Sequence, residues 1–121
     1  MGEIRWKSFA KQNIQTAYIR ANKGTTFEDG AFRDNWNGSK DTDISVGAYH
    51  VLELDTDGTK QAEHFINAVG EDLSGRLIPA VEVRLRGLYR LLPVYKSTAM
   101  FITSTTAHSI ISRFTSFFRN L

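Results

Sequence analysis

Three short apolar runs along the chain end in polar or charged residues. Residues 14–21 form the first run and lead into Asn22, residues 44–52 form the second, and residues 77–85 form the third. A continuous apolar run of this length is typical of a strand that is buried on both faces, as in a parallel sheet. Polar side chains at the carboxyl ends of such strands build the ligand sites of parallel α/β folds. We therefore expect a site at this edge of a parallel sheet.

Helical periodicity fills the intervals between these runs. Residues 6–12, 31–40 and 59–72 carry apolar side chains at helical spacing. The stripe of the last helix consists of Ala62, Phe65, Ile66 and Val69. The order strand, helix, strand, helix, strand predicts βαβ units with right-handed crossovers. After Gly87 the pattern weakens and indicates only one more element, a helix over residues 105–120.

The composition fits one globular domain. The chain has 121 residues, of which 41% are hydrophobic and 23% charged, and its net charge is +2. This length allows one modest core, and the small net charge gives no reason to expect nucleic acid as a partner. The lack of cysteine excludes disulfides and thiolate metal sites. The spacing of the histidines and carboxylates suggests no other metal site.

Neither a membrane span nor an export signal is apparent in the sequence. No apolar run approaches the roughly 18 residues that a membrane helix needs. Residues 1–6 have no signal-peptide pattern. Two interpretations stay open: the chain remains inside the cell, or its true start is missing.

Charge is distributed unevenly along the chain. The first 83 residues hold nine Lys/Arg and all 13 Asp/Glu, whereas residues 84–121 hold six Lys/Arg and no acidic residue. We interpret residues 86–121 as a divergent basic tail. A basic interaction surface is the alternative interpretation.

Four motifs occur in a specific order. They are Ala17-Tyr18-Ile19-Arg20-Ala21 with Gly24-Thr25, then Asp29-x-x-Phe32-x-x-Asn35-Trp36, then Val46-Gly47-Ala48-Tyr49-His50, and finally Pro79-Ala80-Val81-Glu82-Val83. The series resembles glycoside hydrolase family 25, the lysozymes with a modified β/α barrel, over residues 2–85. The resemblance implies an α/β fold of TIM-barrel-like type. We expect a partial (β/α) barrel with parallel strands, in a single domain of residues 1–121 that is truncated relative to the family.

Members of this family cleave the glycosidic bond after N-acetylmuramic acid in peptidoglycan. Their chemistry uses a carboxylic acid that protonates the leaving oxygen and further carboxylates that steady the charged intermediate. By resemblance we expect peptidoglycan glycan strands as the partner, an extracellular or cell-wall location, and no cofactor. We also expect self-association through open sheet edges, because three parallel strands cannot close a barrel.

The chain departs from the family pattern at the third strand. The family has Asp-x-Glu there, and this chain has Glu82 and Arg84. Alternate residues of a strand point to the same side, so both side chains should face the barrel mouth. Glu82 keeps a carboxylate and is the catalytic candidate, while Arg84 places a permanent cation at the proton-donor position. The family glutamate before the glycine after the second strand is Lys23 here, and the chain begins after the family's first-strand aspartate.

The resemblance also implies a set of side chains that contact the glycan. These are Arg20, Asn22, Tyr49, His50 and Arg84. Several have a structural alternative: His50 as a buried histidine satisfied by a neighbour, Tyr49 as a packing residue, and Glu82 as an ion-pair partner of Arg84. Glu53 could replace a lost carboxylate, although we expect it in a solvent-exposed loop.

Three functional hypotheses stay open at this point. The first is a lysozyme-like N-acetylmuramidase that is impaired by the Arg84 substitution. The second is a non-catalytic domain that still binds peptidoglycan. The third is an inactive, truncated remnant. Whether the chain is an enzyme is therefore left undecided by the sequence.

Overall fold

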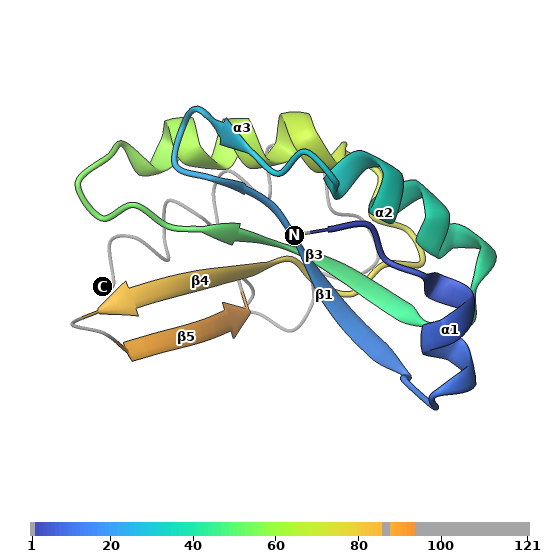
Figure 1. The fold of residues 1–121 in the computed structure, drawn as a ribbon. Helices are drawn as coiled ribbons and strands as arrows, with labels where there is room; N and C mark the ends of the chain where they lie inside the picture. Colours follow the sequence, from blue (N-terminus) through green and yellow to red (C-terminus); the bar gives the residue numbers. More distant parts are fainter. Residues whose placement is uncertain (1, 86–87, 94–121) are drawn as a thin grey trace.

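The protein is built on a five-stranded sheet in the order β2-β1-β3-β4-β5, with α2 and α3 along one face (Figure 1). The structure is a computed structural model that describes residues 2–85 and 88–93, with side chains described as far as Glu82. Its elements are α1 (Trp6–Lys11), β1 (Thr16–Lys23), β2 (Phe27–Glu28), α2 (Phe32–Gly38), the 3-10 helix η1 (Ser39–Asp41), β3 (Ser45–Val51), α3 (Gly58–Val69), β4 (Ala80–Leu85) and β5 (Leu88–Pro93).

The three predicted strands and their parallel arrangement are confirmed. β1 pairs in parallel with β3, and β3 pairs in parallel with β4. The predicted boundaries differ from the observed ones by at most three residues, and the end of β4 at residue 85 coincides with its prediction. The carboxyl ends of β1, β3 and β4 therefore meet at one edge of the sheet.

Two further strands, which the sequence pattern did not predict, flank this parallel unit. β2 pairs with β1, and β5 pairs with β4, both in antiparallel fashion. β2 pairs only Asn22 with Glu28 and Lys23 with Phe27. Such a close reversal depends on Gly24, whose φ of 55° is strained for residues that carry a Cβ. Neither strand had a sequence signal, because β2 is two residues long and β5 lies in an irregular apolar stretch.

The hydrophobic core lies between the sheet and the helices. All four residues of the predicted α3 stripe are buried: Ala62, Phe65, Ile66 and Val69. Asp57 caps α3, since its side chain accepts a 3.0 Å hydrogen bond from the Lys60 amide. On α2, Phe32 and Trp36 stack with ring centroids 5.4 Å apart. Complete burial of a side chain such as Phe65 contributes about 1.5–3 kcal/mol, so this layer holds the helices on the sheet.

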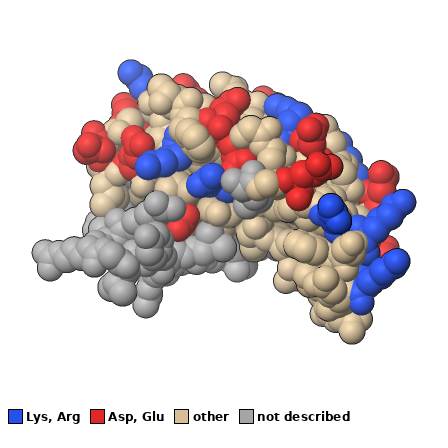
Figure 2. Space-filling view, viewed as in Figure 1, with Lys and Arg blue, Asp and Glu red and all other residues tan. Residues whose placement is uncertain are grey.

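Outside the core, the helices expose a mixture of charges. Figure 2 shows acidic and basic side chains side by side over the helix-covered part of the molecule. This is the pattern of a solvated surface. Within residues 2–85 and 88–93, no helix has the length and apolar character needed to cross a membrane. The predicted helix over residues 105–120 and most of the basic tail lie outside the described residues.

Candidate functional site

The two faces of the sheet carry different parts of the predicted site. Along β3, Val46 and Ala48 belong to the core under the helices. His50 continues this alternation and meets the α3 ring of Phe65 edge-on, with centroids 6.1 Å apart. Since neighbouring side chains on a strand point to opposite faces, Tyr49 belongs to the other face. We call the side under α2 and α3 the helix face and the opposite side the open face.

On the helix face, His50 is completely enclosed. Its exposed fraction is 0%. Its Nδ1 lies 2.7 Å from Oδ1 of Asn22, and its Nε2 lies 2.9 Å from Oε1 of Gln61. Burial lowers the pKa of His50 to about 4, although the hydrogen bond with Gln61 acts in the opposite direction. A ring that is neutral at pH 7 carries a single N–H, so it can donate to only one of these two amide oxygens.

Asn22 and Gln61 extend this network to the backbone. Asn22, also 0% exposed, donates to the His64 carbonyl at 2.9 Å. Gln61 donates to the carbonyls of Glu53 and Thr56 at 2.8 and 3.1 Å, and its Oε1 accepts from the Glu53 amide at 3.0 Å. The network joins the ends of β1 and β3 to α3 and to the loop that follows β3. Sequence reasoning did not single out Gln61, although a polar side chain next to the α3 stripe was the available signal.

Arg20 is the β1 member of the predicted site. Its Nε and Nη2 donate to the same oxygen of Asp29, at 3.0 and 2.9 Å. The guanidinium also lies 5.4 Å from the centre of the exposed ring of Phe27. Burial raises the pKa of Asp29, but hydrogen bonds from the Ala31 amide and from Arg20 outweigh it, so the net pKa is lowered. Arg20 is thus oriented by a buried carboxylate while its side chain keeps 26% exposure.

Tyr49 and Glu82 share the open face with Arg20. The strand register pairs Arg20 with Tyr49, and Val51 with Glu82. Both Tyr49 and Glu82 are half-buried. The Glu82 carbonyl accepts from the Leu52 amide at 3.0 Å, which holds the end of β3 against β4. The structure therefore groups Arg20, Tyr49 and Glu82 on one face and places His50 and Asn22 on the other.

Arg84 can be placed only by its backbone, which pairs with Tyr89 of β5. It lies two residues beyond Glu82 on the same strand. Its side chain is outside the described part, so the predicted ion pair with Glu82 and the predicted contact with glycan remain predictions. Within the described ranges, no group of three or more His, Asp or Glu residues is arranged to hold a metal ion.

Gly47 shapes the open face by its lack of a side chain. A Cβ at this position would lie 2.5 Å from Cε1 of Tyr18 and 2.9 Å from Cβ of Leu77. The Tyr18 ring therefore crosses β3 directly over Gly47. Its hydroxyl donates to the Ile78 carbonyl at 2.7 Å, just before β4 begins. This contact ties β1 to β4 across the face that carries Arg20, Tyr49 and Glu82.

A sheet with helices on one face, and with polar side chains at the carboxyl ends of its parallel strands, is the arrangement found in part of a (β/α) barrel enzyme. The sequence profile of Glycosyl hydrolases family 25 matches residues 1–120. The chain belongs to this family.

Two relatives carry lysozyme names. The chain is 32% identical over 85 residues to the autolytic lysozyme of Clostridium acetobutylicum, covering 69% of this chain and 26% of that protein. It is 34% identical over 82 residues to lysozyme M1 of Streptomyces globisporus, covering 66% of this chain and 28% of that protein. The chain thus spans little more than a quarter of the length of these relatives.

Solved structures show the same fold. A family 25 glycosyl hydrolase from Bacillus anthracis superimposes with a TM-score of 0.68 and 29% identity, over 97% of this chain and 48% of that one. The bacterial lysozyme from Streptomyces coelicolor gives a TM-score of 0.62 with 24% identity, over 98% of this chain and 53% of that one. The predicted fold class, part of a family 25 barrel, is confirmed.

Proposed function

We propose that the open face binds peptidoglycan glycan strands and that the chain is an impaired N-acetylmuramidase. One observation carries the proposal. Arg20, Tyr49 and Glu82 come from three adjacent parallel strands and lie on one face near their carboxyl ends, in a member of family 25. The lysozyme names of the relatives support peptidoglycan as the substrate class. For His50 and Asn22 we propose a positioning role, since both are fully buried on the helix face.

The proposed impairment rests on Glu82 and Arg84, two residues apart on β4. Glycoside hydrolysis requires an acid that gives a proton to the leaving oxygen, and such an acid typically contributes about 100- to 10,000-fold to the rate. A guanidinium at position 84 keeps its proton at neutral pH and cannot fill this role. Glu82 retains a carboxylate that can steady positive charge on the sugar. The reaction needs carboxyl groups and water only, so we propose no cofactor, and an extracellular or cell-wall location follows from the substrate.

Release of muropeptides from purified peptidoglycan tests this proposal. We expect the natural chain to bind sedimented peptidoglycan and to release muropeptides near the background rate. Arg84→Glu alone should leave the rate low, because Glu82 would still stand where the family has aspartate. Lysozyme-like release by the natural chain, abolished in Glu82→Gln, would show instead that Glu82 has become the acid.

A non-catalytic peptidoglycan-binding domain is the second candidate, and the arginine at position 84 favours it. It predicts the same binding with no release, even after prolonged incubation at high protein concentration. An inactive remnant predicts neither binding nor release. The same two measurements therefore separate all three hypotheses.

We also propose self-association through the sheet edge at β1. β2 covers only Asn22 and Lys23, so residues 16–21 have no strand on that side among the described residues. An uncovered strand offers backbone donors and acceptors to a second copy. Sedimentation velocity over a concentration series should show a rising average mass, and a constant monomer mass would contradict the proposal.

A further inference from the structure

Glu53 lies just beyond β3, at the same edge of the sheet as the proposed site. Its backbone is held on both sides by Gln61, which donates to its carbonyl at 2.8 Å and accepts from its amide at 3.0 Å. Gln61 is itself fully buried and in contact with His50. A loop position with both main-chain groups fixed by a buried side chain is well ordered. Glu53 is thus half-buried and anchored, in contrast to the solvent-exposed loop position expected from the sequence.

The carboxylate of Glu53 is seated against Gly24. A Cβ at position 24 would lie 2.7 Å from both Cδ and Oε2 of Glu53, and 3.0 Å from Oε1. A side chain at position 24 would force the carboxylate to move, so the glycine leaves the space that the carboxylate fills. The φ of 55° at Gly24 favours glycine independently. Thr56 donates to Oε2 at 3.2 Å. No donor among the described residues reaches Oε1, which remains available as an acceptor.

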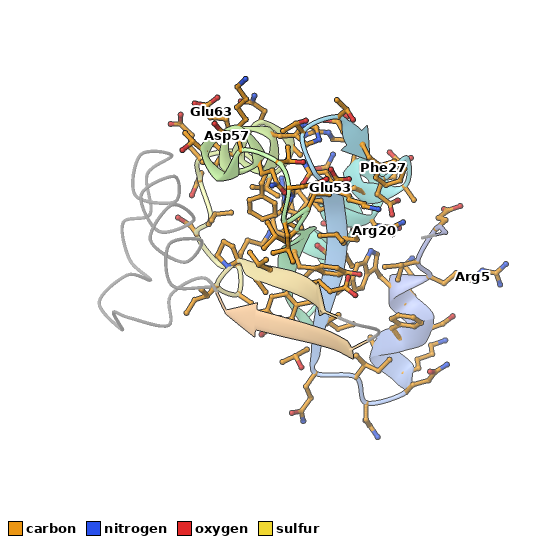
Figure 3. All side chains as sticks on the ribbon, turned by 90° about the vertical axis from the view of Figure 1, so that its left-hand side faces the viewer. Arg5, Arg20, Phe27, Glu53, Asp57 and Glu63 are labelled. Atoms are coloured by element: carbon orange, nitrogen blue, oxygen red, sulfur yellow. The ribbon has the colours of Figure 1, made fainter. Side chains whose placement is uncertain are left out.

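This seat brings Glu53 to the end of β1, beside the proposed site. Gly24 follows Lys23, the last residue of β1, and its amide donates to the Val51 carbonyl at 3.1 Å. Figure 3 shows Glu53 and Arg20 at the same end of the sheet, with Phe27 beside them. Glu63, by contrast, projects from α3 away from this group. Glu53 thus places an acidic group at the strand ends, with its backbone held by Gln61 and its carboxylate accepting a hydrogen bond from Thr56.

We infer that Glu53 is a second carboxylate that contacts the glycan, an inference that rests on the proposed function. A carboxylate only accepts hydrogen bonds, and a 2-acetamido sugar offers hydroxyl and amide N–H donors. Hydrogen bonds to a charged acceptor are shorter and stronger than those between neutral groups. Glu53 thus restores an acidic group next to the position where Lys23 stands in place of the family glutamate.

Binding of a soluble peptidoglycan tetrasaccharide, measured by isothermal titration calorimetry, tests the inference. Glu53→Gln keeps the shape of the side chain and an oxygen for Thr56, so we expect the fold to persist. We expect it to bind about 10-fold more weakly, the loss typical of one hydrogen bond to a charged group. Glu63→Gln is the matched control, because it removes the same charge from an exposed position on α3, and it should bind like the natural chain.

Three further outcomes have clear meanings. Equal binding by the natural chain and Glu53→Gln overturns the inference and leaves the proposed function intact. No binding by the natural chain overturns both. Equal weakening in Glu53→Gln and Glu63→Gln also overturns the inference, since it indicates a general charge effect. A parallel thermal melt confirms that the two variants are compared as folded proteins.

Discussion

The helix face and the open face of this sheet use polar residues in opposite ways. On the helix face, Asn22, His50 and Gln61 are fully buried, and they bind one another and the backbone. In the described ranges no buried side-chain nitrogen or oxygen lacks a hydrogen-bond partner. On the open face, Arg20, Tyr49 and Glu82 stay partly exposed. The first set holds the strand ends together, and the second is accessible to a ligand.

This difference gives neighbouring residues of one motif different roles, one structural and one in binding. Tyr49 and His50 are adjacent, yet alternation places them on opposite faces of β3. Gln61 of α3 forms a hydrogen bond with the backbone of the loop that carries Glu53. The Glu53 carboxylate packs against Gly24, which follows the last residue of β1. A buried polar network beneath the sheet thus supports an acidic group at its edge. Substitutions of the buried network on the helix face should affect stability, and substitutions of Arg20, Tyr49 and Glu82 on the open face should affect binding.

The largest effect on stability should come from Gln61→Leu. This change removes the Gln61 partner of the Glu53 amide, of the Glu53 and Thr56 carbonyls and of His50 Nε2. The Glu53 carbonyl keeps only a 3.4 Å contact with the Thr56 amide, and His50 keeps Asn22. Each buried polar group left unsatisfied costs about 1–3 kcal/mol, so we expect a loss of about 4 kcal/mol after partial rescue by water. Urea denaturation measures it. Asn67→Leu on the exposed side of α3 is the control, and a similar loss there would contradict the role of the network.

Acid should weaken the helix face by a comparable amount. Burial holds the pKa of His50 at about 4 in the folded protein, against 6.5 for an unperturbed histidine. The unfolded chain therefore takes up this proton first as the pH falls. Stability from His50 is complete above pH 6.5 and is lost progressively towards pH 4, by about 3 kcal/mol in total. The His50→Gln variant should lack this component in denaturation curves recorded between pH 7 and 4, and an unchanged slope would refute the assignment.

Gly47→Ala should have an intermediate effect, because it is a packing change on the open face. The added methyl group would meet the Tyr18 ring at 2.5 Å and displace it from β3. Overpacking of this kind typically costs about 1–3 kcal/mol. Tyr18→Ala in the same background should recover part of the loss by removing the clash. Thermal melts of the two single variants and the double variant measure this coupling, and strictly additive losses would contradict the contact.

Much of this arrangement was predictable from the residue pattern, and some of it was not. Apolar runs and the α3 stripe predicted the parallel strands and the helix layer, because burial on a fixed face requires that periodicity. The family motif assigned both Tyr49 and His50 to contacts with the glycan. Because side chains alternate along a strand, the two residues lie on opposite faces of β3. The strand register shifts between Arg20 and Asn22, which no local pattern signals. The position of Glu53 depends on the backbone of Gly24, 29 residues earlier in the chain.

The smallest effect on stability should come from Glu82→Gln, which is the sharpest test of the division between the faces. Glu82 is half-buried on the open face, and its backbone carbonyl accepts from the Leu52 amide, a contact that the substitution does not change. Conversion to an amide keeps the size of the side chain and removes the charge, so we expect the free energy of unfolding to change by less than about 0.5 kcal/mol. Binding to peptidoglycan should fall by about 10-fold, because a charged acceptor is lost.

Parallel urea denaturation and peptidoglycan sedimentation, on the same preparations, measure both quantities for Glu82→Gln and Gln61→Leu. Gln61→Leu should lose about 4 kcal/mol of stability. Below its unfolding midpoint it should lose at most the affinity that Glu53 contributes, since Gln61 has no exposed surface and can act on the glycan only through the Glu53 loop. Glu82→Gln should keep its stability and lose affinity. If both variants lose stability and affinity in the same proportion, the faces are not separable, and Glu82 is part of the structural framework rather than a group that contacts the glycan.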